Sequence, residues 1–148
     1  MENEKSKNVL LIEDNKADVR LITEALTSFN TRKNVYNVSN GIEAMHFLRQ
    51  QEEYKNFPRP DIIILDLNLP GKNGFEILKE IKEDERTKKI PVVVLSVSNS
   101  SDDIDKSYLL QANCYITKSM NLDDFIKDVK KIDDFWLNSV RLPGEFFN

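Results

Sequence analysis

Short apolar runs alternate with longer amphipathic segments along this chain. Five runs are aliphatic or rich in β-branched residues: Val9–Ile12, Val35–Val38, Ile62–Leu65, Val92–Leu95 and Tyr115–Thr117. Their starts lie roughly 25 residues apart, which suits a strand followed by one covering helix. The pattern therefore predicts five β-strand–α-helix units and not a solenoid of identical repeats.

The segments between these runs carry apolar residues at helical spacing. The predicted buried faces contain Val19, Ile22, Leu26 and Phe29; Ile42, Met45 and Leu48; Phe75, Leu78 and Ile81; Ile104, Tyr108 and Leu110; and Leu122, Phe125, Ile126, Val129, Ile132, Trp136 and Val140. The last helix is the longest. Asn121, with Asp124 three residues later, is typical of its N-cap, and Pro143-Gly144 is expected to end it.

Five alternating units predict a doubly wound α/β fold, in which a five-stranded parallel sheet carries helices on both faces. The strand order 2-1-3-4-5 places the first and third strands side by side. At 148 residues the chain has room for one domain with a substantial core. We expect that core at about residues 7–131, with an extended last helix and a tail at 132–148.

Acidic residues follow two of the predicted strands directly. Asp66 comes after Leu65, and Glu13 and Asp14 come after Ile12. Open α/β sheets bind ligands at the carboxyl ends of their strands, so the three carboxylates are expected to converge there. Like charges about 4 Å apart repel by roughly 4 kcal/mol at an effective dielectric near 20. A cation or a raised pKa compensates such repulsion, which predicts a divalent metal site with one carboxylate able to react.

Two further strand ends add polar groups to the same edge. Ser96 ends the fourth strand and offers a hydroxyl, and Lys118 follows the fifth and offers an ammonium. An ammonium approaches phosphate as a compact point charge. Phosphoryl transfer depends mainly on positioning and charge neutralisation. These groups therefore predict a phosphoryl-transfer site in which Asp66 is the nucleophile and forms an acyl phosphate.

Composition excludes several other classes of function. The net charge of −4 argues against a nucleic-acid surface, so no DNA partner is expected. The apolar runs are far shorter than the roughly 20 residues that a membrane-spanning helix needs. The N-terminal residues are polar, and the single cysteine, Cys114, excludes an internal disulfide and a cysteine-based zinc site. We expect a cytoplasmic protein.

Four motifs in order resemble those of the response-regulator receiver domains of two-component systems, across nearly the whole chain. They are Leu11–Asp14, Asp66–Gly74, Val94–Ser96 and Tyr115–Lys118. The resemblance implies the flavodoxin-like fold of chemotaxis-type receivers. It also implies a signalling protein, which catalyses only its own phosphorylation from phosphohistidine and a slow autodephosphorylation.

Residue roles follow from the same resemblance. Asp66 is implied to accept phosphate from a sensor histidine kinase. Mg²⁺, for which Mn²⁺ can substitute, is implied to bind Asp14, Asp66 and the backbone carbonyl of Asn68, with Glu13 acting through water.

The resemblance also implies a conformational switch beside this site. Ser96 and Lys118 are implied to contact the phosphoryl group. Ser96 and Tyr115 match the family's switch pair, whose hydroxyl and ring move inward when the phosphate arrives. One position departs from the family pattern, because Ser119 follows Lys118 where a cis proline is usual. A cis bond without proline costs about 2.5–4 kcal/mol, so the loop either takes a trans route or retains strain.

A narrower resemblance lies in the loops and the tail. Gln51–Tyr54, Pro58–Asp61, Phe135–Leu137 and Leu142–Pro143 are similar to segments of the stand-alone regulators paired with phytochrome-type sensor kinases. The implied partner is therefore a phytochrome-type or hybrid histidine kinase.

Alternative functions fit the sequence less well. An aspartate-nucleophile phosphatase needs a second aspartate two residues after the nucleophile, where this chain has Asn68. A flavodoxin-type cofactor protein needs a phosphate-binding loop after the first strand, and Glu13 and Asp14 would repel that phosphate. The remaining alternative is an unphosphorylated scaffold or a phosphate sink.

The end of the last helix predicts an interface. Phe135, Trp136 and Leu137 are consecutive, and three consecutive helical residues span about 200°, so they cannot all face one core. Exposed apolar surface of this kind commonly marks an interface. We expect a homodimer in which the fifth strand and last helix meet around a two-fold axis; the alternative is a monomer whose tail folds over its own sheet edge. The tail adds Leu142, Phe146 and Phe147.

Overall fold

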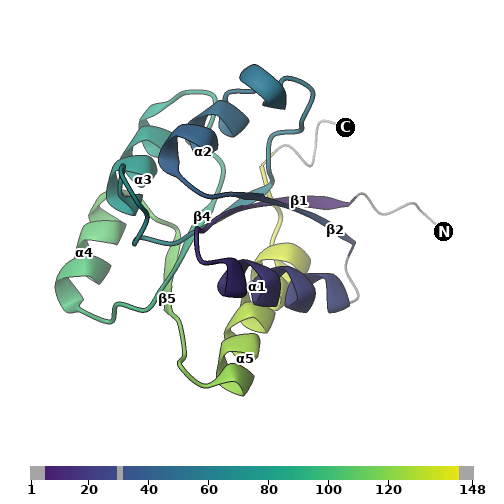
Figure 1. The fold of residues 1–148 in the computed structure, drawn as a ribbon, viewed down its shortest axis with the longest axis vertical. Coiled ribbons are helices and arrows are strands. Elements are labelled where there is room, and N and C mark those ends of the chain that lie inside the picture. Colours follow the sequence, from purple (N-terminus) through teal and green to yellow (C-terminus); the bar gives the residue numbers. More distant parts are fainter. Residues whose placement is uncertain (1–5, 30–31, 144–148) are drawn as a thin grey trace.

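A five-stranded parallel sheet forms the central layer of the computed structural model, which describes residues 6–29 and 32–143. The strand order is β2-β1-β3-β4-β5, as predicted (Figure 1). The strands are β1 (Lys7–Ile12), β2 (Lys33–Val38), β3 (Ile62–Leu65), β4 (Val92–Ser96) and β5 (Cys114–Thr117). Each predicted apolar run therefore lies in its own strand.

Helices cover both faces of this sheet. Helices α1 and α5 lie together on one face, and α2, α3 and α4 lie on the other (Figure 1). Their bounds are α1 (Lys16–Ser28), α2 (Gly41–Leu48), α3 (Gly74–Glu83), α4 (Ser101–Leu109) and α5 (Leu122–Ile132); a 3₁₀ turn, η1 (Glu52–Tyr54), follows α2, and a π-helical segment, η2 (Asp133–Ser139), continues α5.

Each of the five α-helices begins with a side-chain cap. In every case the capping oxygen accepts a hydrogen bond from the backbone N–H three residues later, which satisfies one of the unpaired amides of the first turn. The predicted cap on α5 is confirmed, since Asn121 accepts from the amide of Asp124 at 3.1 Å. The five capping residues are Asn15, Asn40, Asn73, Ser100 and Asn121.

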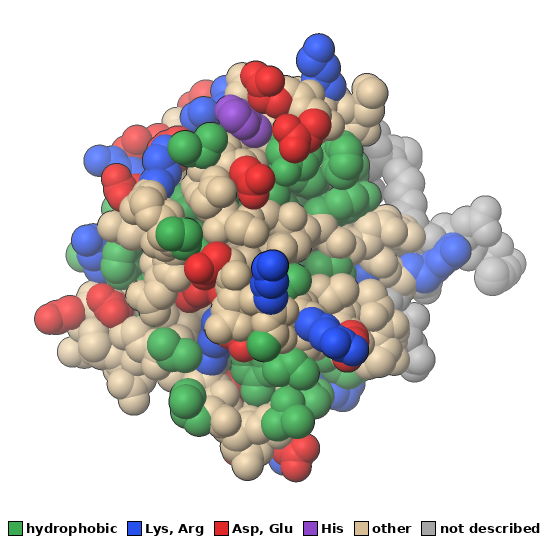
Figure 2. Space-filling view, viewed as in Figure 1, with side chains coloured by type: hydrophobic (Ala, Val, Ile, Leu, Met, Phe, Trp, Pro, Cys, Tyr) green, Lys and Arg blue, Asp and Glu red, His purple; other side chains and the backbone are tan. Residues whose placement is uncertain are grey.

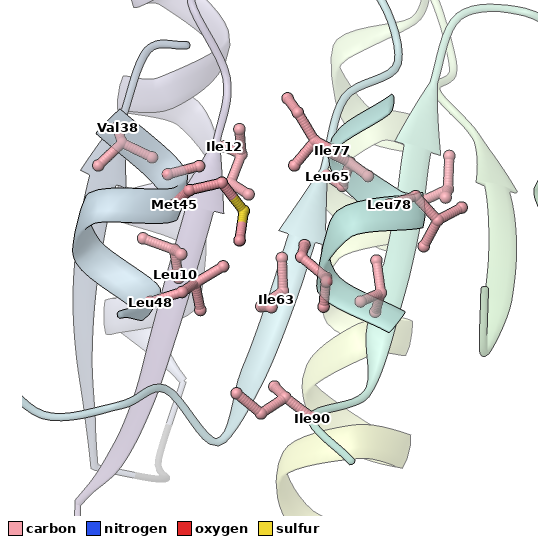
Figure 3. Packing of buried hydrophobic residues seen from close by; sticks show 14 of the residues in the cluster. Leu10, Ile12, Val38, Met45, Leu48, Ile63, Leu65, Ile77, Leu78 and Ile90 are labelled. Atoms are coloured by element: carbon pink, nitrogen blue, oxygen red, sulfur yellow. The ribbon is translucent and has the colours of Figure 1, made fainter. Parts of the chain in front are cut away.

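Alternate residues of the central strands point into two separate cores. Leu10 and Ile12 of β1 belong to the core beneath α2 and α3, which also contains Met45 of α2 and Leu78 of α3 (Figure 3). Their neighbours in β1 pack on the other face, against α1 and α5. The same alternation holds in β3 and β4, whose residues are almost completely buried. Two buried faces explain why these strands read as continuous aliphatic runs.

Three predicted helix faces are partly wrong. On α5, Leu122 and Ile126 were expected to face the core, but both are exposed. Ile42 was expected to face the core, but it is exposed, because Gly41, Ala44 and Met45 form the packed side of α2. Tyr108 on α4 is also largely exposed. Only Ser107 of that helix is buried, so α4 lies loosely against the rest of the molecule.

The prediction of one regular last helix is also wrong beyond Ile132. With α-helical spacing, Trp136 and Val140 would continue the buried face. Instead the chain continues as a π-helix, with the amide of Val140 donating to the carbonyl of Phe135 at 3.0 Å. The wider turn places Leu137, five residues after Ile132, in the core, and leaves Trp136 and Val140 half-buried.

A buried ion pair fixes the start of this π-helix. Lys33 Nζ lies 2.8 Å from Asp133 Oδ1, and both side chains are shielded from water. The same ammonium donates to the carbonyl of Leu26 at 2.8 Å. Asn138 donates to the other carboxylate oxygen of Asp133 at 3.0 Å. The pair thus joins β2, the end of α1 and the continuation of α5.

Charged side chains of both signs are interspersed over the face seen in Figure 2, and hydrophobic side chains gather in its lower part, where α1 and α5 lie. Mixed signs of this kind leave no extended basic surface on the face shown. Within residues 6–29 and 32–143, no helix is both long enough and apolar enough to cross a bilayer.

Replacing Lys33 should destabilise the protein strongly. Lys33→Met strands the Asp133 carboxylate in the core, which should lower the free energy of unfolding in urea by about 3–5 kcal/mol. Adding Asp133→Leu should restore most of that loss, because it removes the stranded charge.

The matched control is Arg20→Met, which breaks an exposed ion pair with Glu24 and should cost at most about 1 kcal/mol. Equal losses from Lys33→Met and Arg20→Met would show that the buried pair has no special role.

Candidate functional site

The pairing of β1 with β3 brings the three predicted carboxylates together. Ile12 lies opposite Leu65 in the sheet, so the residues that follow both strands emerge at one edge. Carboxylate oxygens of Glu13, Asp14 and Asp66 lie within 4.8 Å of one another. Hard oxygen donors at this spacing suit a divalent cation.

The three carboxylates differ in their exposure to water. Glu13 and Asp66 are buried, and Asp14 is exposed. Burial raises the pKa of Glu13 to about 7; the hydrogen bond from Lys118 opposes this shift, and the charge of Asp66 adds to it. Glu13 also accepts a hydrogen bond from the amide of Asn15 at 3.1 Å. The raised pKa of Glu13 therefore reflects mainly the loss of water around its carboxylate, with the charge of Asp66 as a smaller cause.

A tight turn positions Asp66. The amide of Asn68 donates to Asp66 Oδ1 at 3.2 Å, which places the Asn68 backbone beside the cluster. Gly74, the first residue of α3, packs against this turn and donates to the carbonyl of Leu67 at 3.0 Å. A Cβ atom at Gly74 would lie 2.5 Å from the Cα of Leu67 and 2.8 Å from the carbonyl of Asp66. The turn therefore needs glycine at position 74.

Lys118 reaches the cluster from the end of β5. Its Nζ lies 2.7 Å from Glu13 Oε1, 2.8 Å from Asp18 Oδ2 and 3.9 Å from Asp66 Oδ2. Burial alone would lower the pKa of Lys118, but the hydrogen bonds to Asp18 and Glu13 and the nearby charge of Asp66 outweigh it and raise the pKa. Lys118 is therefore a firmly charged group beside Asp66.

Asp18 is the member of this site that the sequence did not predict. It stands in the first turn of α1, where an acidic residue is already explained by the helix dipole. The only available signal was that α1 begins at the edge where Glu13 and Asp14 emerge. Nothing in the sequence indicated that its side chain would reach Lys118, 100 residues away.

Ser96 and Tyr115 occupy neighbouring strands beside the cluster. Ser96 is fully buried, and its Oγ accepts from the amide of Ser98 at 3.3 Å. The hydroxyl of Tyr115 donates to the carbonyl of Ser98 at 2.7 Å. Tyr115 and Ser96 thus hold the same loop between β4 and α4. The hydroxyl of Tyr108 accepts from the amide of Tyr115 at 3.1 Å, which attaches α4 to the open edge of β5.

The family can be identified from this arrangement and its sequence. Residues 9–130 match the response regulator receiver domain family. The chain belongs to this family. Response regulator Rcp1 of Synechocystis sp. is 50% identical over 143 residues, which cover 97% of both chains. The probable methanogenesis regulatory protein FilR2 of Methanothrix harundinacea is 36% identical over 137 residues, covering 92% of this chain and 87% of that protein.

Solved structures of similar receivers include phytochrome response regulators, in line with the resemblance in the loops and tail. The phosphorylated cyanobacterial phytochrome response regulator RcpA is 55% identical and superposes with a TM-score of 0.91, covering 94% of this chain and 99% of that one. The Mn²⁺-bound form of Rcp1 is 51% identical, with a TM-score of 0.89 and coverage of 93% and 99%.

The receiver's departure from the family pattern at Ser119 has a structural explanation. No peptide bond among residues 6–29 and 32–143 is cis, so the loop after Lys118 takes the trans route. The amide and the hydroxyl of Ser119 both donate to Asp128 Oδ2, at 3.1 and 2.8 Å. Proline has neither donor. Serine at this position therefore anchors the loop between β5 and α5 to the buried side of α5.

Adding a side chain at Gly74 should damage the cation site. Gly74→Ala forces the Asp66 turn to move, and we expect the affinity for Mg²⁺, measured by isothermal titration calorimetry, to fall roughly tenfold or more. The control is Gly71→Ala. Gly71 has φ +71 with no atom within 4 Å of the added carbon, so the variant should lose about 1–2 kcal/mol of stability and keep its Mg²⁺ affinity. Unchanged binding in Gly74→Ala would contradict the assigned geometry.

Proposed function

We propose that this receiver accepts a phosphoryl group on Asp66 from the phosphohistidine of a sensor histidine kinase, in a Mg²⁺-dependent reaction. The observation that carries the proposal is the grouping of Asp66 with two further carboxylates and the ammonium of Lys118 at one sheet edge. Two similar receivers add support, since RcpA was solved in a phosphorylated form and Rcp1 with Mn²⁺ bound.

The proposed cation ligands are Asp14, Asp66 and the backbone carbonyl of Asn68, with Glu13 acting through water. The oxygen donors fit Mg²⁺, with Mn²⁺ as a substitute. When bound, the cation neutralises the carboxylates and the incoming phosphoryl oxygens. The spacing of the Glu13, Asp14 and Asp66 oxygens, within 4.8 Å of one another, supports this assignment.

In the proposed reaction a carboxylate oxygen of Asp66 attacks the phosphorus atom. An O–P bond forms, the N–P bond of phosphohistidine breaks, and the imidazole leaves with the electron pair of that bond. Lys118 balances the charge of the transferred oxygens without giving up its proton, as its raised pKa favours. Water attack on the acyl phosphate, which is the slow autodephosphorylation, returns Asp66 to the carboxylate.

The proposed switch uses the loop between β4 and α4. Movement of the Ser96 hydroxyl toward a phosphoryl oxygen would break the hydrogen bond that its oxygen accepts from the amide of Ser98. Tyr115 would then release the carbonyl of Ser98 and rotate inward. Because α4 has little buried surface, a small change in this loop is enough to shift it.

The proposed partner is a phytochrome-type or hybrid histidine kinase, and residues 1–148 are proposed to act as one receiver domain with a C-terminal extension. A cytoplasmic location stays a prediction. The competing proposal, a scaffold or phosphate sink, rests on the same fold but requires no output that depends on phosphate. A phosphorylation assay tests whether Asp66 accepts phosphate at all.

Asp66→Asn should abolish phosphorylation. Wild type incubated with acetyl phosphate and Mg²⁺ should gain the mass of one phosphoryl group, and excess EDTA should prevent that gain. The amide that replaces the carboxylate is not a nucleophile, so the variant should gain nothing. Asp105→Asn, which alters an exposed acid on α4 outside the site, should behave as wild type. A full gain in Asp66→Asn would place the acceptor elsewhere, and no gain in wild type would favour the unphosphorylated scaffold.

We also propose a homodimer through β5 and α5. Phe135 is 53% exposed, and its ring meets the half-buried ring of Trp136 edge-on at 5.2 Å between centroids. Leu137 and Leu142 are buried and belong to the protein's own core. The predicted interface therefore narrows to Phe135 and Trp136. Phe146 and Phe147 lie outside the described residues.

Phe135→Ala should weaken this dimer, because it removes the exposed ring without opening the core. Sedimentation velocity over a range of concentrations, with and without acetyl phosphate, should show a dimer in wild type and mostly monomer in the variant. The control Ile42→Ala truncates an exposed apolar side chain on α2 and should dimerise normally. A wild type that stays monomeric at every concentration would exclude the dimer and favour a tail folded over its own sheet.

A further inference from the structure

The ammonium of Lys118 is shared unequally among three carboxylates. It makes short hydrogen bonds to Glu13 and Asp18, and it lies 3.9 Å from Asp66. A lysine has three N–H donors, and two of them are already directed away from Asp66. A phosphoryl group on Asp66 must therefore compete for Lys118 with carboxylates that hold it in the unphosphorylated protein.

The ammonium of Lys118 can break its hydrogen bond to one of the two competing carboxylates more easily than to the other. The side chain of Glu13 is 1% exposed and that of Asp18 is 26% exposed. A buried carboxylate that loses its cation pays a large desolvation cost, whereas water can replace the lost partner of an exposed one. Lys118 should therefore keep Glu13 and release Asp18.

We propose that Asp18 is a positioning residue that competes with the phosphoryl oxygens for Lys118. The inference rests on the proposed function, because it assumes a phosphoryl group on Asp66. Asp18 holds the ammonium off Asp66 while the receiver is unphosphorylated, and its displacement by the phosphoryl group lowers the net affinity of the site for that group.

Displacement of Asp18 also breaks a link between two elements. Asp18 belongs to α1 and Lys118 follows β5, so their hydrogen bond joins the start of α1 to the loop that follows the edge strand β5. The amide of Asp18 stays bonded to the Asn15 side chain at 3.0 Å, which keeps the helix start in place. Only the side chain moves, so phosphorylation would expose the Asp18 carboxylate to water at the first turn of α1.

Beryllofluoride, a non-covalent mimic of the phosphoryl group, tests this competition at saturating Mg²⁺. Asp18→Asn and Asp18→Ala should bind it roughly 3- to 30-fold more tightly than wild type, because Lys118 no longer leaves a charged partner. The matched control is Glu24→Gln, which removes one negative charge from the same helix, where Glu24 pairs with Arg20 and not with Lys118. It should bind as wild type does.

A second background separates competition for Lys118 from a general effect of charge. In Lys118→Met the Asp18 substitutions should give no gain, since the shared ammonium is absent. An equal gain in that background, or no gain over Glu24→Gln in the Lys118 protein, would overturn the role of Asp18 and leave the proposed function intact. Failure of wild type and all variants to bind beryllofluoride would overturn both proposals.

Discussion

The register between β1 and β3 is the constraint on which the site depends. Ile12 and Leu65 lie opposite each other, so Glu13, Asp14 and Asp66 leave the sheet at the same level and crowd one edge. A slip of one residue would turn every side chain of β3 to the other face. It would also place the two apolar sets of β3 against the wrong cores. Packing of the aliphatic strands thus enforces a gathering of charge that electrostatics alone would oppose.

The ammonium of Lys118 partly compensates the repulsion among these carboxylates. Lys118 directly follows β5, the strand at one edge of the sheet. The β5 strand carries no acidic cluster of its own, yet the residue after it reaches back across β4 and β3 to Glu13. The Ser119 bonds to Asp128 anchor the next residue to α5. The ammonium of Lys118 is thereby held between β5 and α5. The two carboxylates that it contacts, Glu13 and Asp18, differ in their access to water.

Much of this was predictable, and the exceptions share a cause. Strands buried on both faces are recognisable as aliphatic runs, so β1 to β5 could be predicted from the sequence. Residues that follow such strands lie at the carboxyl edge of the sheet, so the clustering of Glu13, Asp14 and Asp66 could be predicted too. Helical periodicity failed where tertiary contacts decide the outcome. The π-helix that buries Leu137 begins at a residue paired with a lysine in β2, and the contact of Asp18 with Lys118 depends on a side-chain direction. Neither is a local property.

The family match ends at residue 130, but the buried residues of this protein continue beyond it. Asp133, Leu137 and Leu142 are all buried, and the first of them neutralises a lysine in the second strand. A chain cut at the family boundary would lose Leu137 from the core shared by α1 and α5 and would remove the carboxylate that pairs with Lys33. Leu137 continues the hydrophobic core of this receiver past residue 130, so limits drawn from family similarity alone would divide that core.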